Sequence, residues 1–449
     1  MHRGGSGRCD CVTAFALVIS FAVSSEASAQ VSNRETLASV PTGTDAASTV
    51  GVVRPLPPPE RPGEPRLDPR RYELAGFPVI GGNSDIGLQF GAAVTWTRFW
   101  DSAFPYLWNI DLLLSASLKD DQNGFRMVQQ SHVLRLDMPD LLHGRMRLDA
   151  RGSFQRTINA GYYGIGNASQ AGPTTDEASG RRYQYVQEEG RVRTILRWHM
   201  APPLDVAVGT NLRYEAPEVY ANTRLSEDLA AGSLAGAQPA LLAGLSAGIM
   251  VDTRDSEFVT RSGYFYQVGM SAVGGSAENV GYGEAAAVLS HYAPLGEWLI
   301  FANRVVASFQ FGRVPFYDLQ QGGVFEPQAL LGGENGVRGV PQGRYAGRVK
   351  VITNTEIRAT PFPRFQLFGQ RLRIGTSTFV DVGRVWSDYA VISPVDGTSL
   401  SLKYGVGLGV FLQWGEAAIF RVEVAYSPDA VAENPDFPVG LYVSDGLMF

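Results

Sequence analysis

Cysteine is almost absent from this chain of 449 residues, because its two cysteines, Cys9 and Cys11, both lie near the start. The remainder therefore has no disulfide framework, no thiolate metal site and no cysteine nucleophile. Histidine is also scarce, and no group of His, Asp and Glu has metal-ligand spacing, so neither a metal nor another cofactor is expected. The net charge of −6 gives no reason to expect nucleic acid as a partner.

Long apolar runs are also missing. After residue 30 no stretch of about 18 or more apolar residues occurs, which argues against a transmembrane helix. Charged residues make up 18% of the chain, against roughly 25% in an ordinary soluble protein. Glycine contributes 51 residues and aromatic residues 11%. This composition favours a membrane β-barrel over a globular enzyme.

The first 29 residues have the pattern of a secretory signal peptide. A positively charged start precedes an apolar run over residues 12–23, and Ala27-Ser28-Ala29 forms a small-residue cleavage site. An apolar helix of that length spans roughly 18 Å, too short for a hydrocarbon core of ~30 Å, so a membrane anchor is the weaker interpretation. Residues 30–71 contain eight prolines and no amphipathic period. They are predicted to form a periplasmic linker.

From Tyr72 to the end, apolar and polar side chains alternate with a period of two. Residues 348–359 carry apolar residues on one parity and charges on the other, broken only by Ile352, and residues 419–426 alternate in the same way. Such strands fit a barrel with lipid outside and a wet lumen inside. The sequence therefore predicts an all-β fold, a transmembrane antiparallel barrel over residues 72–449 in the bacterial outer membrane.

About sixteen strands are expected, although fourteen or eighteen stay open. Eleven precede a long interruption over residues 312–347 and five follow it. The predicted strand starts lie near Tyr72, Ile86, Tyr106, Phe125, Arg145, Arg182, Leu204, Leu241, Gly263, Gly281, Trp298, Arg348, Arg371, Leu402, Ala417 and Val439.

The chain ends on an alternating strand whose last residue is Phe449. Only a closed barrel satisfies every backbone group in lipid, so the first and last strands must pair, with Phe449 at the closure. The first strand contains Pro78 and the pair Gly81-Gly82. Both features weaken a hydrogen-bonded ladder, so the closing seam is expected to be weak.

Four segments carry recognisable motifs. They are an aromatic-Gly-x-Gly-Asn segment at 162–167, an acidic-Arg-Asp strand end at 252–255 with a strand start at 261–264, a Gly-rich loop at 331–340, and a strand at 379–386. In this order they resemble the bacterial surface antigen superfamily, the barrel proteins of outer-membrane protein assembly and two-partner secretion. The resemblance covers about residues 72–449 and implies that the long loop folds into the lumen. The motif residues are Gly332, Gly333, Val337 and Gly339 in the loop, and Phe379 and Gly383 in the strand.

Two carboxylates are expected to face the lumen. Glu356 shares the polar parity of its strand with Arg358, and Asp381 shares that of Arg373. The resemblance implies that Arg338, at the loop tip, enters the lumen and pairs with both acids as a lock. Guanidinium can bind a carboxylate through two parallel hydrogen bonds, which suits this role. The nearby Arg344 is expected to contribute much less.

The chain departs from the family at two places. Val340 stands where an aromatic residue is usual. The family's periplasmic repeats, which handle client polypeptides, have no counterpart in the short linker, since so few residues cannot form a module with its own core. A separate periplasmic protein is therefore a possible partner, beside outer-membrane lipid and client polypeptides.

The favoured function is insertion or translocation of proteins, or of lipids, at the outer membrane without enzymatic chemistry. A passive pore for small solutes and a barrel enzyme acting on lipids are the alternatives. A pore would lack the Gly-rich loop plug. For an enzyme, residues 244–248 match a nucleophile-elbow pattern and Ser290 precedes His291. The elbow, however, needs a turn and a helix that the following strand pattern excludes.

Overall fold

The computed structural model describes residues 70–449, apart from 84–85, 102, 104, 122–123, 171–180, 258, 278–279, 368–369, 390–392, 415–417, 432–437 and 446. The predicted signal peptide (1–29) and nearly all of the predicted linker (30–71) lie outside the described residues. Among the described residues, no helix is both long enough and apolar enough to cross a membrane.

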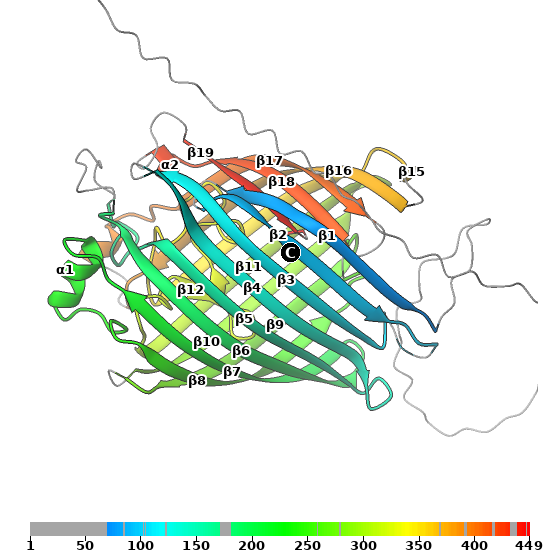
Figure 1. The fold of residues 1–449 in the computed structure, drawn as a ribbon, viewed down its shortest axis with the longest axis horizontal. Coiled ribbons are helices and arrows are strands. Elements are labelled where there is room, and N and C mark those ends of the chain that lie inside the picture. The colour runs from blue at the N-terminus through cyan, green and yellow to red at the C-terminus, as the bar shows by residue number, and fades with distance from the viewer. Residues whose placement is uncertain are drawn as a thin grey trace, which may run out of the picture.

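Sixteen long antiparallel strands form the wall of a barrel (Figure 1). They are β1 (Tyr72–Asn83), β2 (Gly87–Arg98), β3 (Trp108–Asp121), β4 (Gly124–Leu141), β5 (Met146–Gly161), β6 (Gln184–Ala201), β7 (Leu204–Glu218), β8 (Ala240–Asp252), β9 (Gly263–Gly275), β10 (Gly281–Pro294), β11 (Leu299–Arg313), β14 (Val349–Ala359), β16 (Gln370–Trp386), β17 (Lys403–Trp414), β18 (Ala418–Tyr426) and β19 (Val439–Asp445). Each starts within two residues of its predicted position, so the predicted fold class is confirmed.

The remaining elements are short. The helix α1 (Arg224–Ala230) lies between β7 and β8, and α2 (Pro428–Val431) lies between β18 and β19. The 3-10 helix η2 is Pro394–Asp396, β12 (Gln321–Gly322) pairs with β13 (Gln328–Ala329), and β15 (Phe365–Leu367) pairs with β16. Figure 1 shows α1 at one end of the barrel and the start of β1 at the other. Long loops are extracellular and short turns periplasmic in bacterial barrels, so we name these the long-loop end and the short-turn end.

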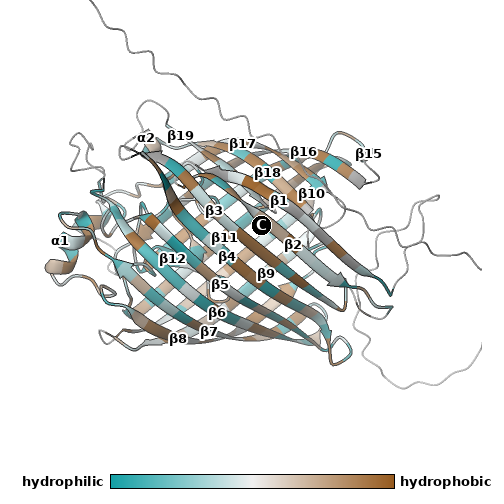
Figure 2. Ribbon diagram, viewed as in Figure 1, coloured by the Kyte–Doolittle hydropathy of each residue, from teal (hydrophilic) through white to brown (hydrophobic). Residues whose placement is uncertain are grey.

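Alternating side chains explain why these segments form a membrane wall. Along β8, Leu241, Leu245 and Ile249 point outward and are exposed, whereas Leu242 and Met250 point inward and are buried. Figure 2 shows the same alternation of hydrophobic and hydrophilic residues along many strands. Apolar side chains on the outer face are stable in lipid, and polar side chains on the inner face are stable around a wet lumen.

The seam between the first and last strands is short. β1 pairs with β2 along all of its residues, but with β19 at only two, Gly82 with Val443 and Asn83 with Tyr442. Both pairs lie where β1 ends, toward the long-loop end. The barrel is therefore nearly closed, and among the described residues most of β1 pairs with no strand on that side.

Candidate functional site

The connection between β11 and β14 runs over residues 314–348, and much of it is buried. At its tip the side chain of Arg338 has no exposed surface. Its Nε donates to Oδ2 of Asp381 at 2.7 Å and its Nη2 to Oδ1 at 2.9 Å. Its Nη1 donates to Oε1 of Glu356 at 2.7 Å and to Oε1 of Glu423 at 2.9 Å. The structure thus brings together the three residues that the sequence placed in the lock, and it adds Glu423.

Strand parity places these acids. Glu356 lies on β14, Asp381 on β16 and Glu423 on β18, each at an inward position between outward-facing neighbours. A strand holds its side chains at fixed alternating positions, so three rigid elements aim carboxylates at one point. We name Arg338 with Glu356, Asp381 and Glu423 the lumen lock.

Two further arginines surround the lumen lock. Arg358 Nε donates to Glu356 Oε2 at 2.7 Å, and Arg421 Nη1 lies 3.6 Å from Glu423 Oε2. The three arginines therefore balance the three carboxylates of this group. Although burial disfavours the charged form, Glu356 and Asp381 raise the pKa of Arg338 above its ordinary value, so the guanidinium stays a cation.

Phe379 and Gly405 shape the seat of the loop tip. The guanidinium carbon of Arg338 lies 3.4 Å from the ring centroid of Phe379, a cation–π contact. A Cβ added at Gly405 on β17 would overlap the carbonyl oxygen of Arg338. The missing side chain therefore lets the loop backbone touch the barrel wall. Above this contact, the hydroxyl of Tyr442 accepts from the backbone N–H of Gly339 at 2.9 Å.

The loop motif residues form the tight turns and the small core of the tip. Gly332, Gly333 and Gly339 have φ values of 126°, 78° and 90°, which favour glycine. A buried hydrophobic cluster lies beside them; its members include Leu330, Leu331, Val337, Val340, Tyr345, Ile352 and Val385. Val340, which replaces the aromatic residue usual at this position, therefore still packs in the core of the loop tip. Ile352, which broke the polar parity of its strand, belongs to this cluster, and Gly383 leaves room for it beside Val337.

A second attachment holds the loop to other strands. Asp318 accepts from both Nη atoms of Arg213 at 2.8 and 2.6 Å, and from the hydroxyl of Tyr282 at 2.7 Å. Phe325 is buried where Gly248 and Gly269 lack side chains, and its carbonyl accepts from Arg193. These contacts lie on β6 to β10, whereas the lumen lock lies on β14 to β18. The loop is therefore fixed to two separate parts of the barrel wall.

Arg344 also binds a neighbouring loop. It is 4% exposed and donates to the carbonyl and the hydroxyl of Ser169 at 2.7 and 2.9 Å. Replacing Arg344 would therefore remove buried contacts of its own, so it is not a neutral control for Arg338. The segment at 162–167 supports the same region, since the N–H of Gly166 donates to the carbonyl of Ala346 at 2.8 Å.

Phe449 was predicted to lie at the closure of the barrel, and the structure places it beyond the last strand. β19 ends at Asp445, and the seam uses Tyr442 and Val443 instead. The carbonyl of Phe449 accepts from Arg358 Nη2 at 2.9 Å, and its ring lies 4.9 Å from the same guanidinium. Arg304 also lies close to this ring, 5.2 Å from its centroid, so two inward-facing arginines make cation–π contacts with the last residue.

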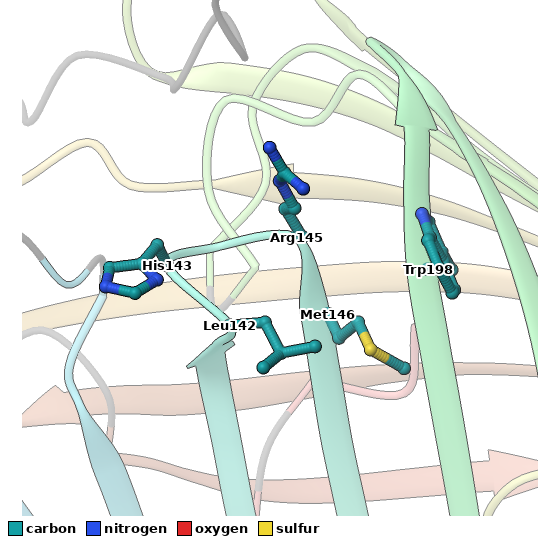
Figure 3. Close-up of a pocket in the computed structure, with 5 residues that line it drawn as sticks. All are labelled: Leu142, His143, Arg145, Met146 and Trp198. Atoms are coloured by element: carbon teal, nitrogen blue, oxygen red, sulfur yellow. The ribbon is translucent and has the colours of Figure 1, made fainter.

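Other candidate sites gain no support. Residues 244–248 lie inside β8, with no turn or helix. Ser290 is buried and faces inward, whereas His291 is exposed on the opposite face. In the part of the chain that the structure describes, no group of His, Cys, Asp and Glu could hold a metal ion. A hollow of about 440 Å³ lies at the turn between β4 and β5, far along the chain from the lumen lock (Figure 3); it is lined by Leu142, His143, Arg145, Met146 and Trp198.

Comparison with known proteins gives one matching family and several similar folds. Residues 128–437 match the family described as the Omp85 superfamily domain. BamA from Haemophilus ducreyi lacking POTRA domains 1–3 is 14% identical, with a TM-score of 0.52, over 84% of this chain and 70% of that one. CdiB from Escherichia coli is 11% identical, with a TM-score of 0.52, over 85% of this chain and 64% of that one. A search of curated proteins finds no match. At these identities the two structures show a shared fold.

Proposed function

Because this chain belongs to the Omp85 superfamily, we propose that it inserts or translocates polypeptides at the outer membrane through its seam, without enzymatic chemistry. The family match agrees with the resemblance that the sequence motifs carry, and it places the chain in the outer membrane. The clients are unfolded outer-membrane or secreted polypeptides. A separate periplasmic protein delivers them, and outer-membrane lipid surrounds the seam.

The observation that carries this proposal is the two-residue pairing of β1 with β19. Opening such a seam breaks few hydrogen bonds, whereas every other pair of neighbouring long strands is joined over at least seven residues. A strand edge with unpaired N–H and C=O groups is a template for another strand. β1 therefore offers its edge to an incoming client strand.

The lumen lock and the second attachment support this proposal against a passive pore. A loop fixed at two parts of the wall occupies the lumen, which a wide solute channel would leave open. In our proposal the loop keeps the wall strands β14 to β18 rigid while the seam opens beside them. Rigidity comes from the charge-assisted hydrogen bonds that cross-connect three strands.

The test is photo-cross-linking in living cells. A photoreactive residue at Ile80, on the β1 edge, is expected to capture outer-membrane or secreted polypeptides during their synthesis. The same residue at Leu245, on the outer face of β8, is the matched control and should capture few. Equal capture at both positions, or only lipid adducts at Ile80, would contradict entry of clients at the seam.

A further inference from the structure

The hollow at the turn between β4 and β5 opens on the outer face of the barrel (Figure 3). Two of the residues that line it, Met146 on β5 and Trp198 on β6, are directly paired across neighbouring strands. The residues next to them in the sequence, Arg147 and Arg197, form ion pairs with buried acids of β4 and β7 on the lumen side. Because side chains alternate along a strand, Met146 and Trp198 point outward, toward lipid.

The hollow lies where the apolar outer face of β5 ends. From Met146 to Phe154, no outward position of this strand carries a polar side chain. The next outward residue, Arg156, lies 3.3 Å from Glu188 in an exposed ion pair on the outer face. The apolar stretch covers about nine residues, which matches the ~9–11 residues of a tilted strand that crosses the hydrocarbon core. The hollow is therefore at the boundary between hydrocarbon and headgroups, in the periplasmic leaflet at the short-turn end.

Apolar walls and a cationic rim meet in this hollow. Its apolar surface comes from Leu142, Met146 and Trp198, of which Leu142 is 63% and Trp198 51% exposed. His143 and Arg145 complete the lining, and both are exposed. Figure 3 shows Met146 and Trp198 on neighbouring strands, with Arg145 just beyond the end of β5. A molecule bound here would therefore meet apolar side chains and a guanidinium at once.

The guanidinium of Arg145 has open N–H groups. Within the part of the chain that the structure describes, its side chain has no hydrogen bond, ion pair or ring contact. The acids nearest to it in the sequence, Asp140 and Asp149, do not line the hollow, and Asp149 lies 2.6 Å from Arg135. Phosphate oxygens bind guanidinium N–H groups through charge-assisted hydrogen bonds, so Arg145 can accept a phosphate.

The turn that forms the rim has an unusual backbone. Leu142, His143 and Gly144 have φ values of 52°, 61° and 77°. Tight hairpin turns with positive φ favour Asn and Gly, because the side chain of most other residues crowds its own backbone there. Here two of the three positions hold Leu142 and His143, which line the hollow. Residues in unfavourable backbone conformations cluster at binding sites, so this turn supports a ligand at the hollow.

The volume and the chemistry of the hollow fit part of a lipid. Its volume of about 440 Å³ lies in the range of roughly 300–1,000 Å³ that is typical of ligand sites. A cation at headgroup depth attracts an anionic phosphate, and apolar side chains just below it are stable against acyl chains. A neutral headgroup would leave the cation without a counter-charge. The ligand therefore carries a negative charge and acyl chains.

We propose that the hollow binds one anionic phospholipid of the periplasmic leaflet. Arg145 and His143 donate to its phosphate. Leu142, Met146 and Trp198 contact its glycerol and the upper part of its acyl chains. This inference concerns lipid contact at β4 to β6 and does not depend on client entry at the seam.

The test is lipid selection by the purified full chain. Detergent solutions with equal phosphatidylglycerol and phosphatidylcholine are analysed by native mass spectrometry. One arginine near an anionic surface contributes roughly five-fold to binding. We therefore expect the wild type to prefer phosphatidylglycerol, and Arg145→Gln to lose about five-fold of that preference. Arg145→Lys should keep most of it, because an ammonium also attracts a phosphate.

Arg181→Gln is the matched control, because it removes one exposed arginine at the long-loop end, where the guanidinium lies over the ring of Tyr220. This variant should keep the preference. The proposal is overturned by a wild-type chain without preference, by an Arg145→Gln variant that keeps it, or by an equal loss in the control. Displacement of the lipid by inorganic phosphate alone would also overturn it, because the apolar walls would then contribute nothing.

A second variant separates binding from folding. Leu142→Asn/His143→Gly gives the turn the residues that its backbone favours, and it removes two side chains from the hollow. The variant should unfold at a urea concentration no lower than that of the wild type and should lose the preference for phosphatidylglycerol. If the relaxed turn kept the preference, Leu142 and His143 would serve the turn alone and the proposal would be wrong.

Discussion

Replacing Arg338 with alanine is expected to lower the free energy of unfolding by about 3–5 kcal/mol, since breaking one side of a buried ion pair leaves its partners uncompensated. In this structure three carboxylates, all at most 3% exposed, would lose their shared donor. The intact cluster adds little net stability by itself, because burying charges is costly. The expected loss therefore reports the cost of leaving three buried carboxylates without their cationic partner. It does not report the net stabilisation by the intact contact.

The measurement is urea unfolding of the refolded barrel in phospholipid vesicles, followed by tryptophan fluorescence. Trypsin cleavage after Arg344 should also become faster, because the freed loop leaves the lumen. Arg338→Lys should rescue only part of the stability, since an ammonium cannot make the planar double contact with Asp381. Arg348→Ala is the matched control, because this residue is partly exposed and its Nη1 donates to a backbone carbonyl, that of Gly312, rather than to a carboxylate. Equal effects of the 338 and 348 variants would disprove the lumen lock.

Replacing Gly405 with alanine is expected to displace the same loop without removing a charge. A Cβ at this position would overlap the carbonyl oxygen of Arg338, a backbone atom that cannot rotate away. Overpacking of this kind typically costs about 1–3 kcal/mol. The Gly405→Ala barrel should therefore unfold at lower urea and show the same faster cleavage after Arg344.

Gly190→Ala is the matched control for this variant. Gly190 also lies within a long strand, β6, but an added Cβ there would meet no atom within 4 Å. Its unfolding midpoint and cleavage rate should stay close to those of the wild type. If Gly405→Ala behaved like Gly190→Ala, the loop tip would not press against β17, and the seat described here would be wrong.

Strand positions could be predicted because alternation is a local property of the sequence. The parity of residues 348–359 placed Glu356 inward, and its one irregularity, Ile352, has a physical reason in the structure. It packs under the loop with Val337, a contact between segments that no local pattern encodes. Alternation therefore predicts which side chains face the lumen. Contact with the loop determines which of these inward positions can be apolar.

Glu423 and Gly405 both contact Arg338 in the structure, and neither was predicted from the sequence to do so. The alternation of residues 419–426 already set Glu423 on the polar face, yet nothing local placed that face beside Arg338. The signal for Gly405 was also present, since Gly405, Gly407 and Gly409 alternate with Tyr404, Val406 and Leu408. Glycines that repeat on one face of a strand indicate that another backbone or a ligand approaches that face closely. The contact of Phe449 with Arg358 joins residues far apart in the chain, so no local pattern could predict it.

If the seam between β1 and β19 opens for clients, a disulfide across it should stop their entry. Gly82→Cys/Val443→Cys joins two paired residues in a chain whose native cysteines, Cys9 and Cys11, precede the predicted cleavage site. Leu289→Cys/Val305→Cys, across β10 and β11, is the control pair. We expect oxidation of the seam pair to abolish client capture at Ile80, reductant to restore it, and the control pair to leave it unchanged. Undiminished capture with the seam fully oxidised would show that clients do not enter between β1 and β19.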